Sequence, residues 1–281
     1  MAVLQDPVEA PFPDQLKARL NDPKDRSAKY RVSNLVTRAV VGVIGFVLPF
    51  IFIFWEGVVL DEGGVKVRGS LSAYYHTSAR DIFVAALCII GFFLMTYMSG
   101  ERRTLGFWLS LVAGLAVLGV AFFPKLRPSL PPGAPECGTL PMPEGCSPIQ
   151  QVLGERLVAQ IHFVCAAVFI LLLAAMCFFV FAKGEEERSK DPRWKTPPWM
   201  ATVIRLCGAV ILLAVLWVAA SQFLELTIGP LTPLYLAEVV SVWAFGVAWL
   251  LKARDLMEVI PVLGRANGRP PVEKQQPAAA D

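Results

Sequence analysis

The sequence has little charge and few of the residues on which soluble enzymes rely. Only 17% of its 281 residues are Asp, Glu, Lys or Arg, against about 25% in an average soluble domain. It has two histidines and no HxxxH spacing, which argues against the usual histidine-rich zinc centre, and no CxxC pair, which argues against a thiol oxidoreductase. The basic residues form no nucleic-acid-binding patch. Long apolar stretches dominate what remains.

Six of these stretches are apolar on every side and about as long as a membrane-spanning helix. Crossing a bilayer takes about 20 apolar residues, and a helix that is apolar all round is surrounded by lipid or by other helices. The sequence therefore predicts an all-α integral membrane protein with a bundle of six transmembrane helices. Their expected ranges are Leu35–Trp55, with Pro49 bending its outer third, Asp81–Ser99, Leu105–Phe123, Leu157–Ala182, Met200–Phe223 and Leu236–Leu251, for which Thr232 is an alternative start.

The distribution of basic residues predicts the orientation. Most of the 26 Lys and Arg residues fall on one side of the six stretches, and the positive-inside rule makes that side cytoplasmic. We expect a multi-pass protein of a bacterial plasma membrane with both termini in the cytoplasm. The expected organisation is a cytoplasmic segment 1–34, a transmembrane domain 35–255 with an outer loop 124–154, and a disordered cytoplasmic tail 256–281.

Two of the six cysteines lie outside the apolar stretches. Cys137 and Cys146 flank GTLPMPEG in the outer loop, where an oxidising environment allows disulfides to persist. The sequence therefore predicts a Cys137–Cys146 disulfide. The other four cysteines lie inside the spans, where they are expected to act as small apolar packing residues.

Polar side chains inside membrane spans are costly and tend to mark functional sites. In this sequence they gather near the outer ends of four separate segments. We expect the four segments to converge on an outward-facing polar pocket. Its candidate ligand-binding residues are Tyr75, His76, Arg80, Asp81, His162, Glu225 and Glu238.

Each of these residues also has a structural interpretation. His76 follows two tyrosines and fits an interfacial belt. His162 could be a buried neutral histidine bonded to Glu155 or Gln160, and Arg80 could pair with the aspartate that follows it. The glutamates could contact lipid headgroups. Arg205 lies inside the fifth stretch near the cytoplasm, where we expect it to reach phosphate headgroups.

Two runs of the chain resemble known membrane proteins: SLSAYYHTSARDIFVAALCIIGFFLMTY and AQIHFVCAAVFILLLAA. Across about residues 35–255 the chain resembles bacterial multi-pass membrane proteins of unknown function and, more loosely, the eukaryotic Frag1/DRAM-like six-helix membrane proteins. The resemblance implies six helices and brings no established reaction. It also implies an outward-facing polar element at Tyr74, Tyr75, His76, Arg80, Asp81 and His162.

The preferred functional hypothesis is a non-enzymatic protein, without a cofactor, that binds a lipid or small amphipathic ligand in the outward pocket. The runner-up is a metal-dependent intramembrane hydrolase, whose zinc would be held by His76, His162 and a carboxylate from Asp81, Glu155, Glu225 or Glu238. A haem held by the two histidines is a further option. A small transporter or channel is a third hypothesis.

Small residues recur every four positions on the third stretch, at Gly106, Ser110 and Gly114. Such a stripe lets another helix approach closely, and a homo-oligomer could form through it. The other expected partners are membrane lipids. We expect no nucleic acid.

Overall fold

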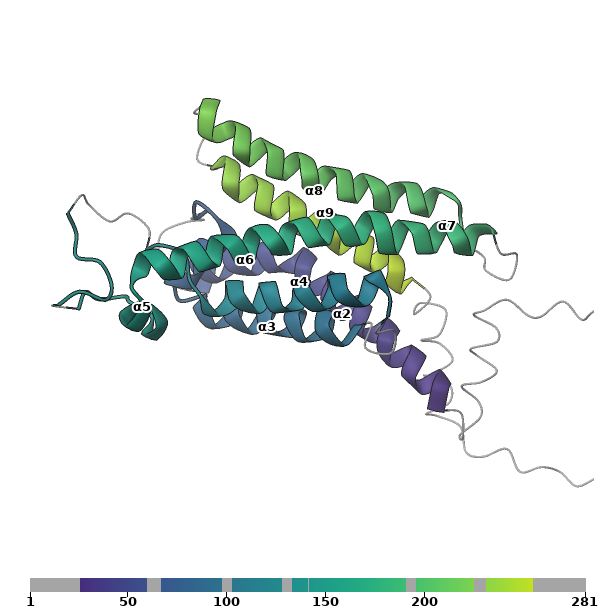
Figure 1. The fold of residues 1–281 in the computed structure, drawn as a ribbon, viewed down its shortest axis with the longest axis horizontal. Coiled ribbons are helices and arrows are strands. Elements are labelled where there is room, and N and C mark those ends of the chain that lie inside the picture. The colour runs from purple at the N-terminus through teal and green to yellow at the C-terminus, as the bar shows by residue number, and fades with distance from the viewer. Residues whose placement is uncertain are drawn as a thin grey trace, which may run out of the picture.

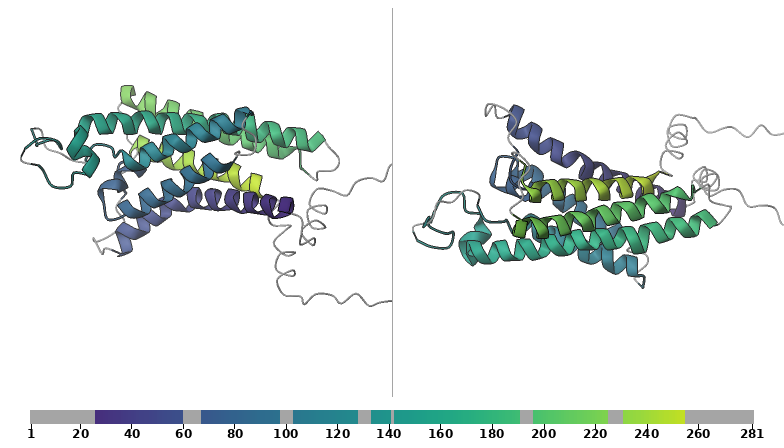
Figure 2. Two further views of the ribbon diagram at one scale, coloured as in Figure 1. Left: turned by 60° about the horizontal axis from the view of Figure 1, so that its bottom comes forward. Right: turned by 90° about the horizontal axis from the view of Figure 1, so that it is seen from above.

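The computed structural model describes residues 26–59, 67–97, 103–127, 133–140, 142–190, 196–224 and 231–254. Within these ranges every regular element is a helix (Figure 1). The long helices run up and down alongside one another (Figure 2). They are α2 (Arg26–Phe54), α3 (Arg80–Tyr97), α4 (Leu105–Phe122), α6 (Glu155–Met176), α8 (Trp199–Leu224) and α9 (Pro233–Ala253).

Shorter elements link or extend the long ones. The π-helix η1 (Trp55–Val59) extends α2, the 3-10 helix η2 (Leu71–His76) precedes α3, and α5 (Pro148–Leu153) precedes α6. The π-helix η3 (Cys177–Ala182) and α7 (Lys183–Lys190) continue α6. Residues 155–190 therefore form one helical rod, which is longer than the predicted span 157–182.

Five helical stretches are long and apolar enough to cross a membrane: Leu35–Gly57, Leu105–Phe122, Glu155–Lys190, Trp199–Ser221 and Pro233–Ala253. They confirm the predicted apolar helices at five of the six positions. The predicted span Asp81–Ser99 forms α3, which is helical but is not among the five. The described helices thus support a membrane protein with five candidate spans.

The start of α9 confirms the alternative boundary at Thr232 for the last predicted span. Thr232 is the N-cap, and its hydroxyl accepts a hydrogen bond from the backbone N–H of Tyr235 at 3.1 Å. Proline at the first helical position suits a helix start, because the missing N–H would have no helical partner there. The helix therefore begins at Pro233, where a window based on apolar residues alone starts at Leu236.

Small residues set the closest helix contacts. A Cβ on Gly114 would lie 2.7 Å from the carbonyl oxygen of Gly91, so α3 and α4 can approach this closely only because both positions are glycine. Ser110 donates to the carbonyl of Leu94 in the same contact. The small-residue stripe of α4 thus packs against α3 of the same chain, and a homo-oligomer through it stays a prediction.

Aromatic side chains fill the bundle between the helices. The rings of Phe181 and Trp249 lie 5.0 Å apart, and those of Phe245 and Trp249 lie 5.1 Å apart, where η3 meets α9. Many large apolar side chains point outward instead, among them Leu213 and Leu216 of α8, each 63% exposed. An apolar exterior of this kind suits lipid contact rather than water.

The bundle has two ends of different character (Figure 1). The disulfide end consists of residues 67–77, residues 123–127, the disulfide loop (residues 133–140 and 142–147) and α5. The α7 end consists of the start of α2, the end of α9 and α7. Most of the predicted polar residues that the structure describes lie at the disulfide end or on the helix turns next to it.

Candidate functional site

Residues 67–77 fold into a short buried turn that carries the first part of the site. Ser70 is the N-cap of η2, and its Oγ accepts a hydrogen bond from the N–H of Ala73 at 3.1 Å. Serine is favoured at this position because its side chain satisfies a backbone N–H that has no helical partner. Residues 70–75 are all buried, and the ring of Tyr74 stacks on Phe52 of α2 at 4.8 Å. The turn is therefore part of the packed bundle.

Lys125, just beyond the end of α4, joins this turn to α5. Its Nζ donates to Ser70 Oγ at 2.8 Å. Its carbonyl accepts from Nε2 of His76 at 2.8 Å and from the side-chain amide of Gln150 at 3.3 Å. Because a carbonyl only accepts, the proton of neutral His76 lies on Nε2.

Burial controls the protonation of both side chains that meet here. It lowers the pKa of His76, an effect that the hydrogen bond to the carbonyl of Lys125 partly opposes. It also lowers the pKa of the Lys125 ammonium, against the attraction of the Glu238 carboxylate. Desolvation disfavours the charged form of each group. His76 is thus held neutral, and Lys125 gives up its proton more readily than an exposed lysine.

Glu238 reaches the same turn from the second turn of α9. Its Oε2 accepts a hydrogen bond from the backbone N–H of Leu71 at 2.5 Å. That N–H lies in the first turn of η2, where no helical acceptor is available. Glu238 thereby connects α9 to η2 and places a carboxylate near Lys125.

The other predicted residues contact different partners from those expected. His162 of α6 donates from Nδ1 to the carbonyl of Phe123 at 2.7 Å, which is neither Glu155 nor Gln160, the partners named in its structural interpretation. Arg80 donates to the hydroxyl of Tyr75 at 3.0 Å and lies over the tyrosine ring. The guanidinium carbon is 4.6 Å from the ring centroid. Arg80 therefore pairs with an aromatic ring.

Two predicted residues stay apart from this arrangement. Asp81 is exposed at the start of α3, and Glu225 lies outside the described residues. The structure brings five of the predicted residues to the disulfide end: Tyr75, His76, Arg80, His162 and Glu238. Three of them contact backbone groups of the turn or of the chain leaving α4.

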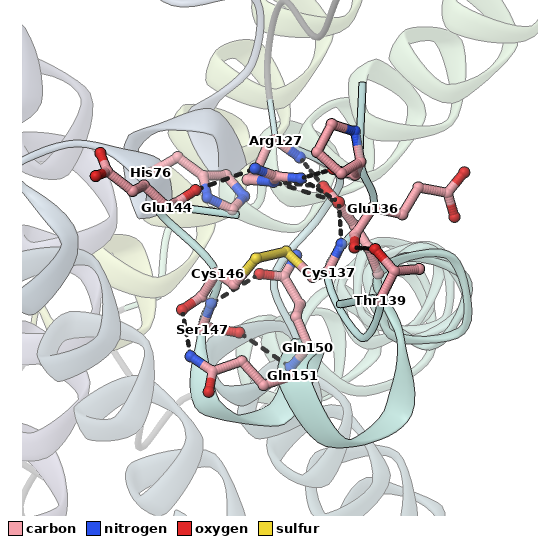
Figure 3. Close-up of a disulfide and its surroundings, with 12 residues drawn as sticks. His76, Arg127, Glu136, Cys137, Thr139, Glu144, Cys146, Ser147, Gln150 and Gln151 are labelled. Carbon is pink, nitrogen blue, oxygen red and sulfur yellow. Dashed lines mark hydrogen bonds and ion pairs between the residues drawn. A yellow bond between two sulfur atoms is a disulfide. The ribbon is translucent and has the colours of Figure 1, made fainter. Parts of the chain in front are cut away.

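The predicted disulfide is present (Figure 3). Cys137 and Cys146 are bonded, with their Cα atoms 5.7 Å apart. Ser147 follows as the N-cap of α5, where its side chain and that of Gln150 form a capping box. Both caps satisfy N–H groups that a six-residue helix leaves without partners. The disulfide and the capping box together order the loop.

A buried ion pair fastens this loop to the bundle. Glu155, whose side chain is 1% exposed, accepts hydrogen bonds from Arg127 N at 2.8 Å, Arg127 Nη2 at 3.0 Å and Cys137 N at 3.2 Å. Arg127 also donates to the carbonyls of Pro135 and Glu144, each at 3.0 Å. One arginine thus binds both arms of the disulfide loop (Figure 3).

The candidate residues chosen from the sequence do not include Ser70, Lys125 or Arg127, which the structure places at the disulfide end. The two cations entered the sequence analysis only as basic residues of an outer loop. The position of these two cations was a usable signal, because PKLR follows the apolar run of α4 directly. A cation at the end of an apolar helix has limited access to water and needs a protein partner. Their partners lie 55 and 28 residues away in sequence, so no local pattern reveals them.

Arg205 has a protein partner that the sequence analysis did not name. It forms an ion pair with Glu186 of α7, and the expected contact with lipid headgroups stays a prediction. α7 was not predicted, so its carboxylates were not available as partners in the sequence analysis.

In the described ranges no three His, Cys, Asp or Glu side chains lie close enough to hold a metal ion. Each histidine instead has one ring nitrogen on a backbone carbonyl. Comparison with protein-family models, with curated protein sequences and with solved structures finds no match for this chain. The resemblance to Frag1/DRAM-like proteins stays a prediction, and the function has to be argued from the residues themselves.

Proposed function

We propose that the chain is a six-helix protein of a bacterial plasma membrane that binds a lipid or small amphipathic ligand at its disulfide end. In this topology α3 completes the six spans, both termini are cytoplasmic, and the disulfide end faces outward. The Cys137–Cys146 bond is consistent with this orientation, because disulfides persist in oxidising compartments.

One observation carries the ligand proposal: the polar contact of Lys125 is made from a chain segment that also bears exposed apolar side chains. Lys125 is half-buried on Ser70, while Phe122 and Leu126 on either side of it are 54% and 47% exposed. A polar head placed at Lys125 would leave its chain against Phe122 and Leu126. Binding sites for such ligands combine apolar walls with a few convergent polar groups.

The other polar groups of the disulfide end support the same site. Arg80 is half-buried above Tyr75 and offers further donors for an anionic head. His76 and Glu238 hold the turn on which Ser70 lies, so they position the site through its backbone. In this proposal Arg80 and Lys125 contact the ligand, and the histidines keep their structural hydrogen bonds.

Native mass spectrometry of the detergent-released protein tests the proposal, with phosphatidylglycerol added as the probe. We expect a retained lipid in the wild type and a loss of about tenfold in retention for Lys125→Ala, since a hydrogen bond to a charged group contributes about 1.5 kcal/mol or more. Arg156→Ala is the matched control, because Arg156 is a cation at the same end whose side chain is 78% exposed. Equal retention in all three proteins would contradict the proposal.

A further inference from the structure

The contact between Lys125 and Ser70 places an amine next to a serine hydroxyl, an arrangement that ligand binding alone does not require. The amine nitrogen and the hydroxyl oxygen are 2.8 Å apart, which is within the range for direct proton transfer. Ser70 Oγ also accepts the N–H of Ala73, and a donor on this oxygen stabilises negative charge that develops there. The serine is thus in contact with a base and with an electrostatic stabiliser.

A serine hydroxyl is a weak nucleophile unless an adjacent base takes its proton. A neutral lysine can fill that role, and Ser–Lys pairs form one of the recurring variants of the catalytic triad. Burial lowers the pKa of Lys125, while the Glu238 carboxylate on α9 opposes this effect. The other titratable groups that face Lys125 are His76 of η2 and His162 of α6.

We propose that Ser70 is the nucleophile and Lys125 the general base of an acyl-transfer site for an ester of amphipathic character. This inference rests on the proposed function for the location of the substrate. Either protonation state of Lys125 can contact a bound ligand, but only the neutral amine can start the reaction.

The reaction takes two steps and needs only water as a co-reactant. Lys125 takes the proton of Ser70 as Oγ bonds to the ester carbonyl carbon, and the alkoxy group leaves with that proton as an alcohol. Water then attacks the acyl-serine, with Lys125 taking its proton and returning one to Ser70 Oγ. The products are a carboxylic acid and the free enzyme.

The proposal needs an approach to a buried serine. Ser70 is fully buried, but Gly69 before it is exposed. Gly69 has no side chain, and a Cβ built there would lie 3.5 Å from Cγ2 of Thr232, which is an ordinary van der Waals distance. The proposal therefore places the approach of the substrate at Gly69, the exposed residue next to the nucleophile.

A fluorophosphonate probe tests the inference on the full-length protein in detergent. Attack by Ser70 Oγ on phosphorus expels fluoride and leaves a stable adduct that intact-mass measurement and peptide mapping detect. We expect one adduct, on Ser70, that forms faster as pH rises through the pKa of Lys125. Absence of this adduct in the wild type between pH 7 and 10 would overturn the inference.

Lys125→Arg tests whether residue 125 acts as a base or only as a structural cation. Arginine keeps the charge and the hydrogen-bond donors but does not lose its proton in proteins. We expect labelling to fall at least about 100-fold, the lower range for general-base catalysis, with an unchanged melting temperature. Labelling at the wild-type rate in Lys125→Arg would also overturn the inference.

Two serine variants complete the test. Ser70→Cys retains a nucleophile and a small side chain, and we expect its thiol to react with iodoacetamide; an inert thiol would contradict an accessible site. Ser78→Ala removes an exposed serine of the same segment and should leave labelling unchanged. If the wild type retains lipid but is never labelled, only the acyl-transfer inference fails; labelling without lipid retention would refute the binding proposal instead.

Discussion

The two ends of the bundle use polar side chains in different ways. At the disulfide end they bond mainly to backbone groups: His76 and His162 donate to carbonyls of residues 123–125, and Glu238 accepts from the first turn of η2. At the α7 end carboxylates pair mainly with the side chains of Lys and Arg. The first end thus combines hydrogen bonds to the main chain with the buried Arg127–Glu155 ion pair, whereas the second relies mainly on ion pairs between side chains.

The α7 end is organised around Glu185. Its buried carboxylate lies 2.6 Å from Lys252 of α9 and 3.1 Å from Arg188. A more exposed pair joins Glu186 to Arg205 of α8. These contacts connect α7 to α9 and to α8 through side chains.

The physical reason for the difference lies in the backbone. Every helix end leaves N–H or C=O groups without helical partners, and buried groups of this kind must find other partners. The disulfide end contains short elements and non-helical segments, so its side chains are used to satisfy main-chain atoms. At the α7 end the helices continue past the apolar region, and charged side chains meet each other instead.

Removing the carboxylate of Glu155 should have the largest effect on stability. Glu155→Ala leaves Arg127, whose side chain is only 10% exposed, without its buried partner and removes the acceptor of the Cys137 N–H. Breaking one side of a buried ion pair costs about 3–5 kcal/mol. Thermal unfolding in detergent measures this loss. Glu136→Ala, which removes the exposed partner of Arg156, is the control and should change little.

Glu185→Gln tests the α7 end in the same way. The amide keeps the shape of the side chain but loses the charge that faces Lys252 and Arg188, so we expect a loss of about 2 kcal/mol. Hydrogen exchange should increase in α7 and at the end of α9, with no change at residues 67–77. If exchange rose equally at both ends, the two ends would not be independent. Glu186→Gln, on the exposed side of α7, serves as the control.

Acidification should loosen the disulfide end through His76. Burial holds the folded-state pKa of His76 below the value of about 6.5 for an unfolded chain, so the folded protein binds fewer protons. The stability that neutral His76 contributes is therefore fully present above pH 6.5 and is lost as the pH falls toward the folded-state pKa. Hydrogen exchange of residues 67–77 should increase between pH 7 and pH 5. His76→Gln keeps a donor and should remove this dependence; an unchanged profile in that variant would assign it to another group.

The smallest expected effect comes from the helix caps. Ser147→Ala removes the N-cap of α5 and half of its capping box, at a cost of about 1 kcal/mol. Because the disulfide still closes the loop, faster exchange should be confined to residues 148–153. Lys190→Ala, which removes an exposed i,i+4 pair at the α7 end, should change exchange less. A larger increase in exchange for Lys190→Ala than for Ser147→Ala would contradict this expected order of effects.

Sequence reasoning located the helices better than the site. Apolar length is a local property, so five predicted spans coincide with helices that could cross a membrane, and the spacing of Cys137 and Cys146 in a loop rich in Pro and Gly was enough to predict their bond. The structural interpretations named Glu155 or Gln160 for His162 and Asp81 for Arg80, whereas the structure shows contacts with Phe123 and Tyr75. Both choices considered neighbours in sequence, whereas His162 binds a carbonyl 39 residues away.

The sequence by itself determined an apolar helical protein with a disulfide-closed loop, because hydrophobic length and cysteine placement need no knowledge of neighbours. Only the tertiary structure decided which polar groups meet. Ser70, Lys125 and Glu238 come from three segments that are far apart in the chain. The main-chain groups of a short buried turn need hydrogen-bond partners. The packing of the helices determines which side chains are near enough to be those partners.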